Sequence, residues 1–311
     1  MEIRTECERG EVEHMDKLTV GDTCIHSISE IEYCKVDIPF LFNSITQEEI
    51  LRNTDWLGED VIDIPGGKLG LAFRAYLIKV GELNVLVDAC NGNHKQRPTA
   101  KWQHELDRTD FLDALNTAGV NPAQIDIVVC THLHCDHVGW LTELAGDQWV
   151  PTFPNATHFF SEREFSYFEK KLQVSDTTMV NHGSFEDSVL PVVKMCRYSL
   201  VKNDAILVDD IGGIVKLVST PGHSVDHVAI SVQSRGQEAL ICGDAIHHPI
   251  QLDLPRMPMR ADFEPELAVS TRLSILEHCA NTGAWLLAGH FSTGPFTKVR
   301  KYKDCFRFDN N

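Results

Sequence analysis

The sequence predicts a mixed α/β (α+β) fold in which two β-sheets pack face to face and helices cover their outer surfaces. The first observation is the order of the elements, because strand-like runs and helical patterns alternate similarly in the two halves of the chain. The second is that no linker rich in Gly, Ser or Pro divides the 311 residues. We therefore expect a single domain over 1–311, with residues 1–20 as a polar N-terminal arm.

The first half of the chain contains several strand-like stretches and one helical pattern. Runs of β-branched and aromatic residues predict strands at 22–35, 70–80, 83–90 and 125–130. Gly81-Glu82 separates the second and third runs and indicates a hairpin. Apolar residues at helical spacing predict a helix over 108–118, ended by Gly119. Residues 36–68 are irregular and aromatic, and we expect part of them to overhang a cleft.

The second half repeats this alternation. Ser161 and Glu164 form a capping-box pattern, which predicts a helix from there to about Lys171. The period of 264–279 predicts another helix, whereas 172–200 is predicted to be a loop with a short helix. The predicted strands are one that ends at 159–160 and those at 205–208, 214–219, 227–232, 239–242 and 285–288.

Composition excludes several classes of function. The formal net charge of −17 argues against a nucleic-acid substrate, and the basic cluster at 298–303 is expected to be a solvated helix face or tail. No run approaches the roughly 20 apolar residues of a membrane span, and the charged N-terminus does not resemble a signal peptide. The ten cysteines contain no CxxC pair, which is typical of reduced thiols in a cytoplasmic protein.

Four candidate metal ligands follow the strand at 125–130 within six residues: His132, His134, Asp136 and His137. Imidazole and carboxylate groups together suit zinc and similar divalent ions. The two histidines that lie two residues apart can point the same way, whereas the adjacent Asp136 and His137 point elsewhere. The spacing therefore predicts two ions. We expect Cys135, inside the motif, to be a packing residue.

Three later strands are each followed by a glycine and a further candidate ligand: Gly222-His223, Gly243-Asp244 and Gly289-His290. A glycine at such a position lets the backbone turn sharply and approach an ion. We therefore expect these three side chains to complete the site.

This constellation resembles the metallo-β-lactamase superfamily from about residue 20 to 300, and the resemblance implies an αββα sandwich with a dinuclear site at its rim. Carried over position by position, it implies seven ligands: His132, His134 and His223 for the first ion, Asp136, His137 and His290 for the second, and Asp244 bridging both. Asp88 matches a further family aspartate, whose expected role is to accept a hydrogen bond from a ligand imidazole. Zn²⁺ is the expected metal, and Mn²⁺, Co²⁺ or Fe²⁺ would suit the same ligands.

The resemblance also implies hydrolysis. A hydroxide formed between the two ions would attack a carbonyl or phosphoryl centre, and Asp136 would pass its proton to the leaving group. A glutamate replaces His134 in the di-iron redox branch of the superfamily, so His134 favours a hydrolase. No Gly-x-Ser-x-Gly motif indicates a serine mechanism.

Residues 131–140 and 149–156 resemble the branch that contains N-acyl-homoserine lactonases and methyl parathion hydrolase. In the lactonases a tyrosine stands three residues after the bridging aspartate, where this chain has His247. A histidine can donate the same hydrogen bond to a substrate carbonyl, so we name His247 a candidate catalytic residue. A packing or capping role for His247 and His248 stays open.

We expect an apolar pocket whose candidate lining residues are Trp56, Trp140, Phe153 and Phe291, with Phe40 or Phe42 in addition. Such a pocket suits a small, neutral, ring-containing substrate, and a cyclic ester opened by a lactonase-like hydrolase is the first expectation. A cyclic amide or carbamate and a phosphotriester are the alternatives, while a non-catalytic metal-binding sensor represents another class. A homodimer formed through the N-terminal arm is a further prediction.

Overall fold

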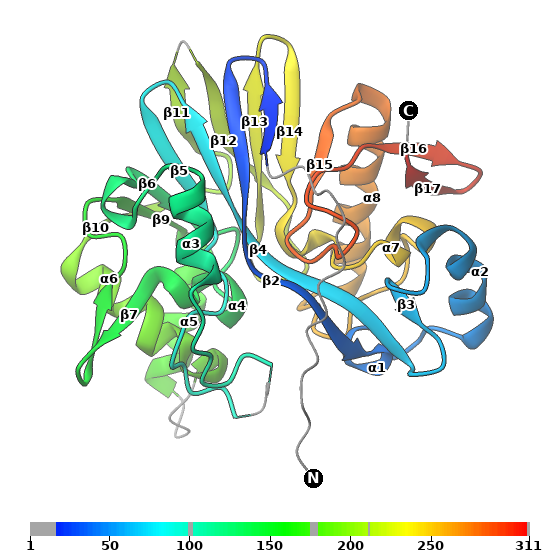
Figure 1. Cartoon of the computed structure of the whole chain (residues 1–311), viewed down its shortest axis with the longest axis horizontal. Helices are drawn as coiled ribbons and strands as arrows, with labels where there is room; N and C mark the ends of the chain where they lie inside the picture. The colour runs from blue at the N-terminus through cyan, green and yellow to red at the C-terminus, as the bar shows by residue number, and fades with distance from the viewer. Residues whose placement is uncertain (1–16, 99–101, 175–179, 211, 310–311) are drawn as a thin grey trace.

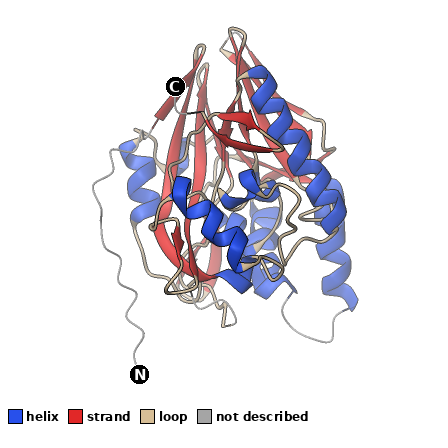
Figure 2. Ribbon diagram, turned by 90° about the vertical axis from the view of Figure 1, so that its right-hand side faces the viewer, coloured by secondary structure: helices blue, strands red, loops and turns tan. Residues whose placement is uncertain are grey.

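Two β-sheets lie face to face between two layers of helices in the computed structural model, which describes residues 17–98, 102–174, 180–210 and 212–309 (Figures 1 and 2). The eight-stranded sheet has the order β1-β2-β4-β5-β6-β9-β10, with β3 paired to β4. Its strands are β1 Lys17–Val20, β2 Thr23–Asp37, β3 Ile62–Asp63, β4 Lys68–Val80, β5 Leu83–Val87, β6 Ile127–Val129, β9 Thr157–Ser161 and β10 Arg197–Val201. The five strands of the second sheet are, in order, β11 Ile206–Asp210, β12 Gly213–Ser219, β13 Val228–Ser234, β14 Gln237–Ile241 and β15 Trp285–Leu287.

Three hydrophobic layers explain this stacking. Residues such as Ile78 and Val129 of the first sheet pack on Val215 and Ile230 of the second, forming a core between the sheets. The outer face of the first sheet is covered by α3 Asp110–Thr117, α5 Glu162–Val174 and α6 Leu190–Met195. The outer face of the second sheet is covered by α8 Pro265–Thr282. The αββα architecture expected from the sequence is confirmed.

The remaining elements lie at the rim or on the flanks of the sandwich. They are α1 Ile38–Leu41, α2 Gln47–Leu57, α4 Cys135–Val138, α7 Ile250–Asp253, the hairpin β7 Thr142–Ala145 with β8 Gln148–Pro151, and the hairpin β16 Val299–Tyr302 with β17 Cys305–Phe308. Short 3₁₀ or π turns are η1 Pro122–Gln124, η2 Gly139–Leu141, η3 Val180–Gly183, η4 Phe185–Val189 and η5 Gly243–Ala245. Within the described ranges, none of the helices combines the length and hydropathy that a bilayer span needs.

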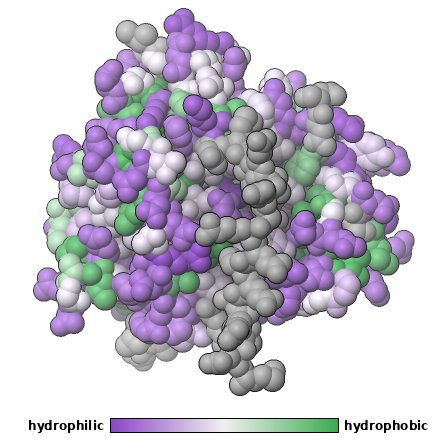
Figure 3. Space-filling model, viewed as in Figure 1, coloured by the Kyte–Doolittle hydropathy of each residue, from purple (hydrophilic) through white to green (hydrophobic). Residues whose placement is uncertain are grey.

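Several local predictions need correction. The basic cluster at 298–303 is predicted to be a helix face or tail, but most of it forms β16, in which Val299 packs inward and the next three residues are exposed. The segment 36–68, predicted to be irregular, contains α2, and 172–200 contains β10. Residues 1–16 of the predicted arm lie outside the described residues, so the dimer through the arm stays a prediction. On the face shown in Figure 3, hydrophilic residues cover most of the described surface.

The topology brings four strand ends to one edge. β12, β14 and β15 run in the same direction, because β12 and β14 are both antiparallel to β13 and β14 is parallel to β15. Their carboxyl ends therefore meet at one rim of the second sheet. The end of β6 faces this rim from the first sheet, since Val228 N donates a hydrogen bond to Thr131 O over 2.9 Å.

Candidate metal centre

The rim carries two groups of metal-binding side chains that share one aspartate. The first group is His132, His134, His223 and Asp244, and the second is Asp136, His137, Asp244 and His290. In each group the candidate ligand atoms lie within 4.8 Å of one another. The structure thus brings together all seven residues predicted to be ligands, in two groups that share Asp244.

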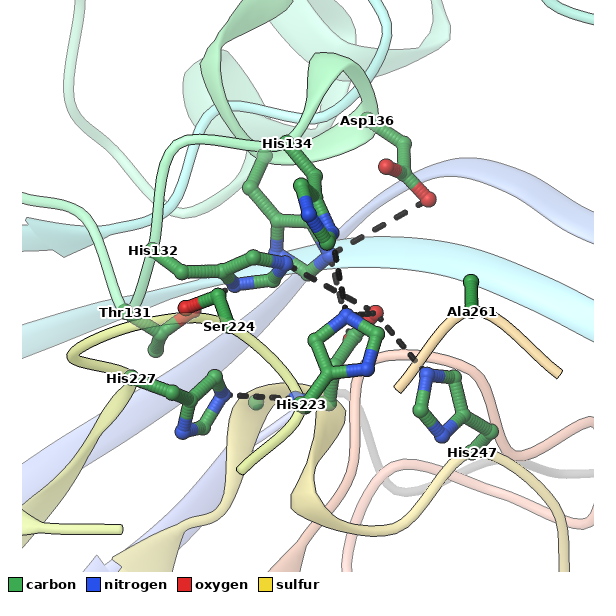
Figure 4. A network of polar contacts seen from close by, with 12 residues as sticks. Thr131, His132, His134, Asp136, His223, Ser224, His227, His247 and Ala261 are labelled. Atoms are coloured by element: carbon green, nitrogen blue, oxygen red, sulfur yellow. Dashed lines mark hydrogen bonds and ion pairs between the residues drawn. The ribbon is translucent and has the colours of Figure 1, made fainter. Parts of the chain in front are cut away.

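Asp244 stands between the groups, with one carboxylate oxygen directed at each. Its Oδ1 lies 3.1 Å from Nε2 of both His137 and His290, in the second group. Its Oδ2 lies 3.4 Å from His223 Nε2 and 3.8 Å from His132 Nε2, in the first group. Figure 4 shows the rings of His132, His134 and His223 in contact with one another, with Asp136 beside them. The Asp244 carboxylate, placed between the groups, fits a bridge between two ions.

The outer ring nitrogens of four histidines are held by other groups. Asp88 Oδ2 lies 2.9 Å from His137 Nδ1, which is the contact expected of Asp88, and Asp262 Oδ1 lies 3.1 Å from His223 Nδ1. His290 Nδ1 lies 2.9 Å from the Ala72 carbonyl oxygen. His132 Nδ1 lies 3.1 Å from Thr131 Oγ1, which in turn donates to Asp88. Such contacts fix the ring so that Nε2 points into the site, as in protein metal centres.

Several atoms at the centre of the site are buried and lack a hydrogen-bond partner: His132 Nε2, His137 Nε2 and Asp244 Oδ1. Buried polar atoms without a partner are costly unless another group satisfies them. All of these atoms are metal donors that belong to the Asp244 carboxylate or lie beside it, so this donor set fits divalent ions.

Electrostatics keeps the first group in its metal-binding protonation state. Burial, together with the neighbouring imidazoles, lowers the pKa of His132 and His223 well below the usual value and that of His134 to about 3. Burial opposes ionisation of Asp244, but His137, His290 and His247 outweigh it and hold the pKa of this carboxyl well below its usual range. The first group therefore presents neutral imidazoles to an ionised carboxylate.

Sequence reasoning missed two residues that support the ligands. His227 Nε2 accepts a hydrogen bond from the Asp244 backbone N–H over 3.0 Å, and its Nδ1 lies 2.8 Å from Thr220 Oγ1. The sequence offered one signal for His227, namely its position four residues after the candidate ligand His223. Asp262 had no such signal, because it belongs to an irregular loop that only the tertiary structure brings against His223.

The glycines beside the ligands are not equivalent, although the sequence pattern treated them alike. Gly222 has φ of +126°, and a Cβ there would lie 2.2 Å from the Ala268 backbone nitrogen. Gly243 has φ of +47°, and a Cβ there would lie 2.6 Å from His227 Nε2. At Gly289 the nearest atom would be 3.4 Å away, which is an ordinary contact. Only the first two positions require glycine.

A cavity of about 280 Å³ opens over the ligands. Its apolar lining comes from β2, α1, β4 and two loops: Val36, Phe40, Leu41, Leu71, Phe73, Trp102, Met259 and Ala261. Its polar lining beyond the ligands comprises Gln103, Asn181, His182 and His247, with the Cys135 thiol. No lysine or arginine belongs to the lining drawn from the described ranges. As predicted, part of 36–68 overhangs the site, through Phe40 and Leu41.

The four aromatic residues predicted to line the pocket do not belong to its lining. Trp140 stacks on Phe111 and donates its indole N–H to Glu30, and Phe153 is fully buried in the same core. Phe291 is buried beneath α8, and Trp56 packs edge-on against Phe308. Burial of large apolar area draws such rings into the core. Phe42 is likewise buried, whereas Phe40 reaches the pocket.

The two histidines after Asp244 differ in their surroundings. His247 lines the pocket, and its Nε2 lies 3.1 Å from Asp244 Oδ2 (Figure 4). His248 points away into the protein, where its Nδ1 accepts from Ile250 N and its Nε2 lies 3.2 Å from the Val61 carbonyl oxygen. His248 therefore packs and caps the following turn. Cys135 is buried, with its Sγ 3.1 Å from Gln103 Oε1, and belongs to neither ligand group.

Comparison with known proteins agrees with the geometry. An N-acyl homoserine lactonase of Bacillus thuringiensis is 23% identical over 239 residues, which cover 73% of this chain and 84% of the relative. The crystal structure of the hydrolase AbOPH superposes with a TM-score of 0.75 at 23% identity, covering 96% of this chain and 98% of the other. The dizinc quorum-quenching lactonase AidC superposes with a TM-score of 0.74 at 14% identity, covering 95% of this chain and 96% of the other.

The family model of the metallo-beta-lactamase superfamily matches residues 74–286, more than half of the chain. This range contains six of the seven clustered residues, and His290 lies four residues beyond its end. The chain therefore belongs to the metallo-beta-lactamase superfamily, whose members named above are metal-dependent hydrolases and lactonases.

Proposed function

We propose that this enzyme is a dinuclear metal hydrolase that opens a neutral cyclic ester. The observation that carries the proposal is the placement of Asp244, whose two oxygens face two separate ligand groups. His132, His134 and His223 would hold one ion and Asp136, His137 and His290 the other, with Asp244 between them. Zn²⁺ is the proposed metal, which the dizinc centre of the structural neighbour supports.

Two bound divalent ions would supply a Lewis acid and activate water at neutral pH. The residues around them have separate tasks. Asp136 has 18% of its side chain exposed and lines the pocket, so it is placed to take a proton and return it to the leaving alkoxide. His247 also faces the pocket, where its ring N–H can donate a hydrogen bond to the substrate carbonyl oxygen. The apolar wall excludes bulk water from the reacting ester.

The pocket lining supports a neutral substrate. Apolar and aromatic side chains form most of the wall, and the cations that would bind a carboxylate or phosphate are missing from its described part. The lactonases among the relatives and structural neighbours support a cyclic ester as the first choice. Cyclic amides, carbamates and phosphotriesters would use the same attack and belong in the same test.

The test combines metal analysis with a pH-stat screen of lactones, lactams, aryl carbamates and phosphotriesters. We expect about two ions per chain and acid release from neutral lactones. Asp244→Ala should lose at least about 10³-fold in kcat/KM, because it removes the group shared by both sites. Asp209→Ala, an exposed change on β11, serves as the control and should match the wild type. Two ions without turnover of any substrate would contradict the proposal in favour of a metal-binding sensor.

A further inference from the structure

The buried carboxylate of Glu164 has no place in the hydrolytic chemistry proposed above. The sequence pattern assigned it to a capping box at the start of α5, but only half of that motif exists. The Glu164 N–H donates to Ser161 Oγ over 3.3 Å, whereas the Glu164 carboxylate turns inward and is 1% exposed. A side chain that gives up a local cap to enter the interior must find its partners there.

Those partners belong to the two loops that carry the first ligand group. Glu164 Oε1 accepts from the Leu133 N–H over 3.4 Å, and Leu133 lies between the ligands His132 and His134. Glu164 Oε2 accepts from Ser224 Oγ over 2.9 Å and from the Asp226 N–H over 3.0 Å, directly after the ligand His223. One carboxylate thus connects a loop of the first sheet to a loop of the second.

The two loops also meet at the ligands themselves, where His223 Nε2 lies 3.0 Å from His134 Nδ1. The Val228 N–H donates to the Thr131 carbonyl at the base of both loops. Leu133 is fixed from its other side by Asn181, whose Nδ2 donates to the Leu133 carbonyl. Ser161 Oγ donates to the Asp226 carboxylate, so the start of α5 holds the second loop at two points.

The chemistry of the contact calls for a carboxylate. All three groups that face Glu164 are donors, and an ionised carboxylate is the side chain that offers acceptors alone. A glutamine would direct its NH₂ group at one of these donors and leave it unsatisfied. The loops that carry His134 and His223 would then lose one of the hydrogen bonds that set their spacing.

We propose that Glu164 is a positioning residue of the metal centre, which sets the spacing of the first ligand group by joining its two loops. This inference rests on the proposed function, since it assumes that the two groups hold ions. The inference applies to the first ligand group alone, because the partners of Glu164 flank His134 and His223 and none flanks His137 or His290.

The test measures Co²⁺ affinity by chelator competition and the Co²⁺ absorption spectrum, in full-length protein with one ligand group disabled. In a His290→Ala background the remaining ion occupies the first group, and adding Glu164→Gln should weaken it about 10–100-fold and change its spectrum. In a His134→Ala background the ion occupies the second group, and Glu164→Gln should leave its affinity within about twofold. Glu238→Gln, a carboxylate with several hydrogen bonds at the far end of β14, is the control and should change neither.

Equal weakening in both backgrounds would mean a general structural role and overturn the inference, as would unchanged affinity in both. If Glu164→Gln does not fold, Ser224→Ala removes one donor and leaves the carboxylate in place. A several-fold loss confined to the first group would then support the inference, and no loss would overturn it. Wild-type protein that binds no Co²⁺ would instead refute the proposed function.

Discussion

The turn before His223 offers a substitution whose effect can be worked out from the structure. In Gly222→Ala the new Cβ would lie 2.2 Å from the Ala268 backbone nitrogen and 2.5 Å from its Cα. These atoms belong to α8 and cannot move aside by a change of rotamer, so the turn must shift by about 1 Å to reach an ordinary contact. A shift of that size in a reacting group costs about 10²-fold in rate. The φ of +126° adds strain of about 1–3 kcal/mol.

We therefore expect Gly222→Ala to lose at least about 100-fold in kcat/KM and to bind fewer ions per chain than the wild type. Gly289→Ala is the matched control, because Gly289 also precedes a ligand but a Cβ there would make only a 3.4 Å contact. It should keep kcat/KM within about threefold. Kinetics on the identified substrate, metal analysis and thermal melts check both variants. A Gly222→Ala enzyme with near wild-type activity, or equal damage by both changes, would refute this reasoning.

Two more predictions concern pH and substrate. His158 is buried, and burial lowers its pKa from 6.5 to about 4, so it stays neutral in the folded state while the unfolded chain takes up a proton below pH 6.5. The stability that neutral His158 contributes is fully present above pH 6.5, and about 3 kcal/mol of it is lost as the pH falls towards 4. Urea unfolding at pH 7 and 4.5 should show a smaller loss of unfolding free energy in His158→Leu than in the wild type. Equal losses would contradict this. Trp102 and Phe40 form an edge-to-face pair in the pocket wall, with their ring centroids 4.6 Å apart. Because Trp102→Ala removes apolar surface from this wall, it should raise KM about tenfold for ring-containing substrates. Steady-state kinetics should show kcat nearly unchanged, and a loss confined to kcat would assign the ring another role.

The ligands could be predicted from the sequence because each follows a strand, and strand ends are positions at which the local pattern and the tertiary structure agree. His132 to His137 lie within six residues, and the topology of β12, β14 and β15 brings the rest to the same rim. The pocket wall could not be predicted in this way. Its residues lie at scattered positions of β2, α1, β4 and several loops, so nothing local distinguishes Phe40 in the cavity from Phe42 in the core.

Two identical local signals show the limit of such reasoning. Thr46 and Glu49 have the spacing of a capping box and form one at the start of α2, with reciprocal hydrogen bonds of 3.2 and 2.8 Å. Ser161 and Glu164 have the same spacing, but the carboxylate binds distant loops instead. The difference lies in burial, since Glu49 is only half-buried, whereas Glu164 is enclosed and accepts from the donors around it. Propensity decides the first case and the tertiary environment the second.

The floor and the wall of the pocket are built from separate parts of the chain. The floor consists of strand ends held by both sheets. The wall uses β2, α1, β4 and the segments around Trp102, Asn181 and Met259, which carry none of the ligands. Insertions or substitutions in these outer segments can therefore reshape the space above the ions while the catalytic geometry persists. Such a division gives evolution a fixed reaction with an adjustable substrate range, and it gives protein engineers the same freedom.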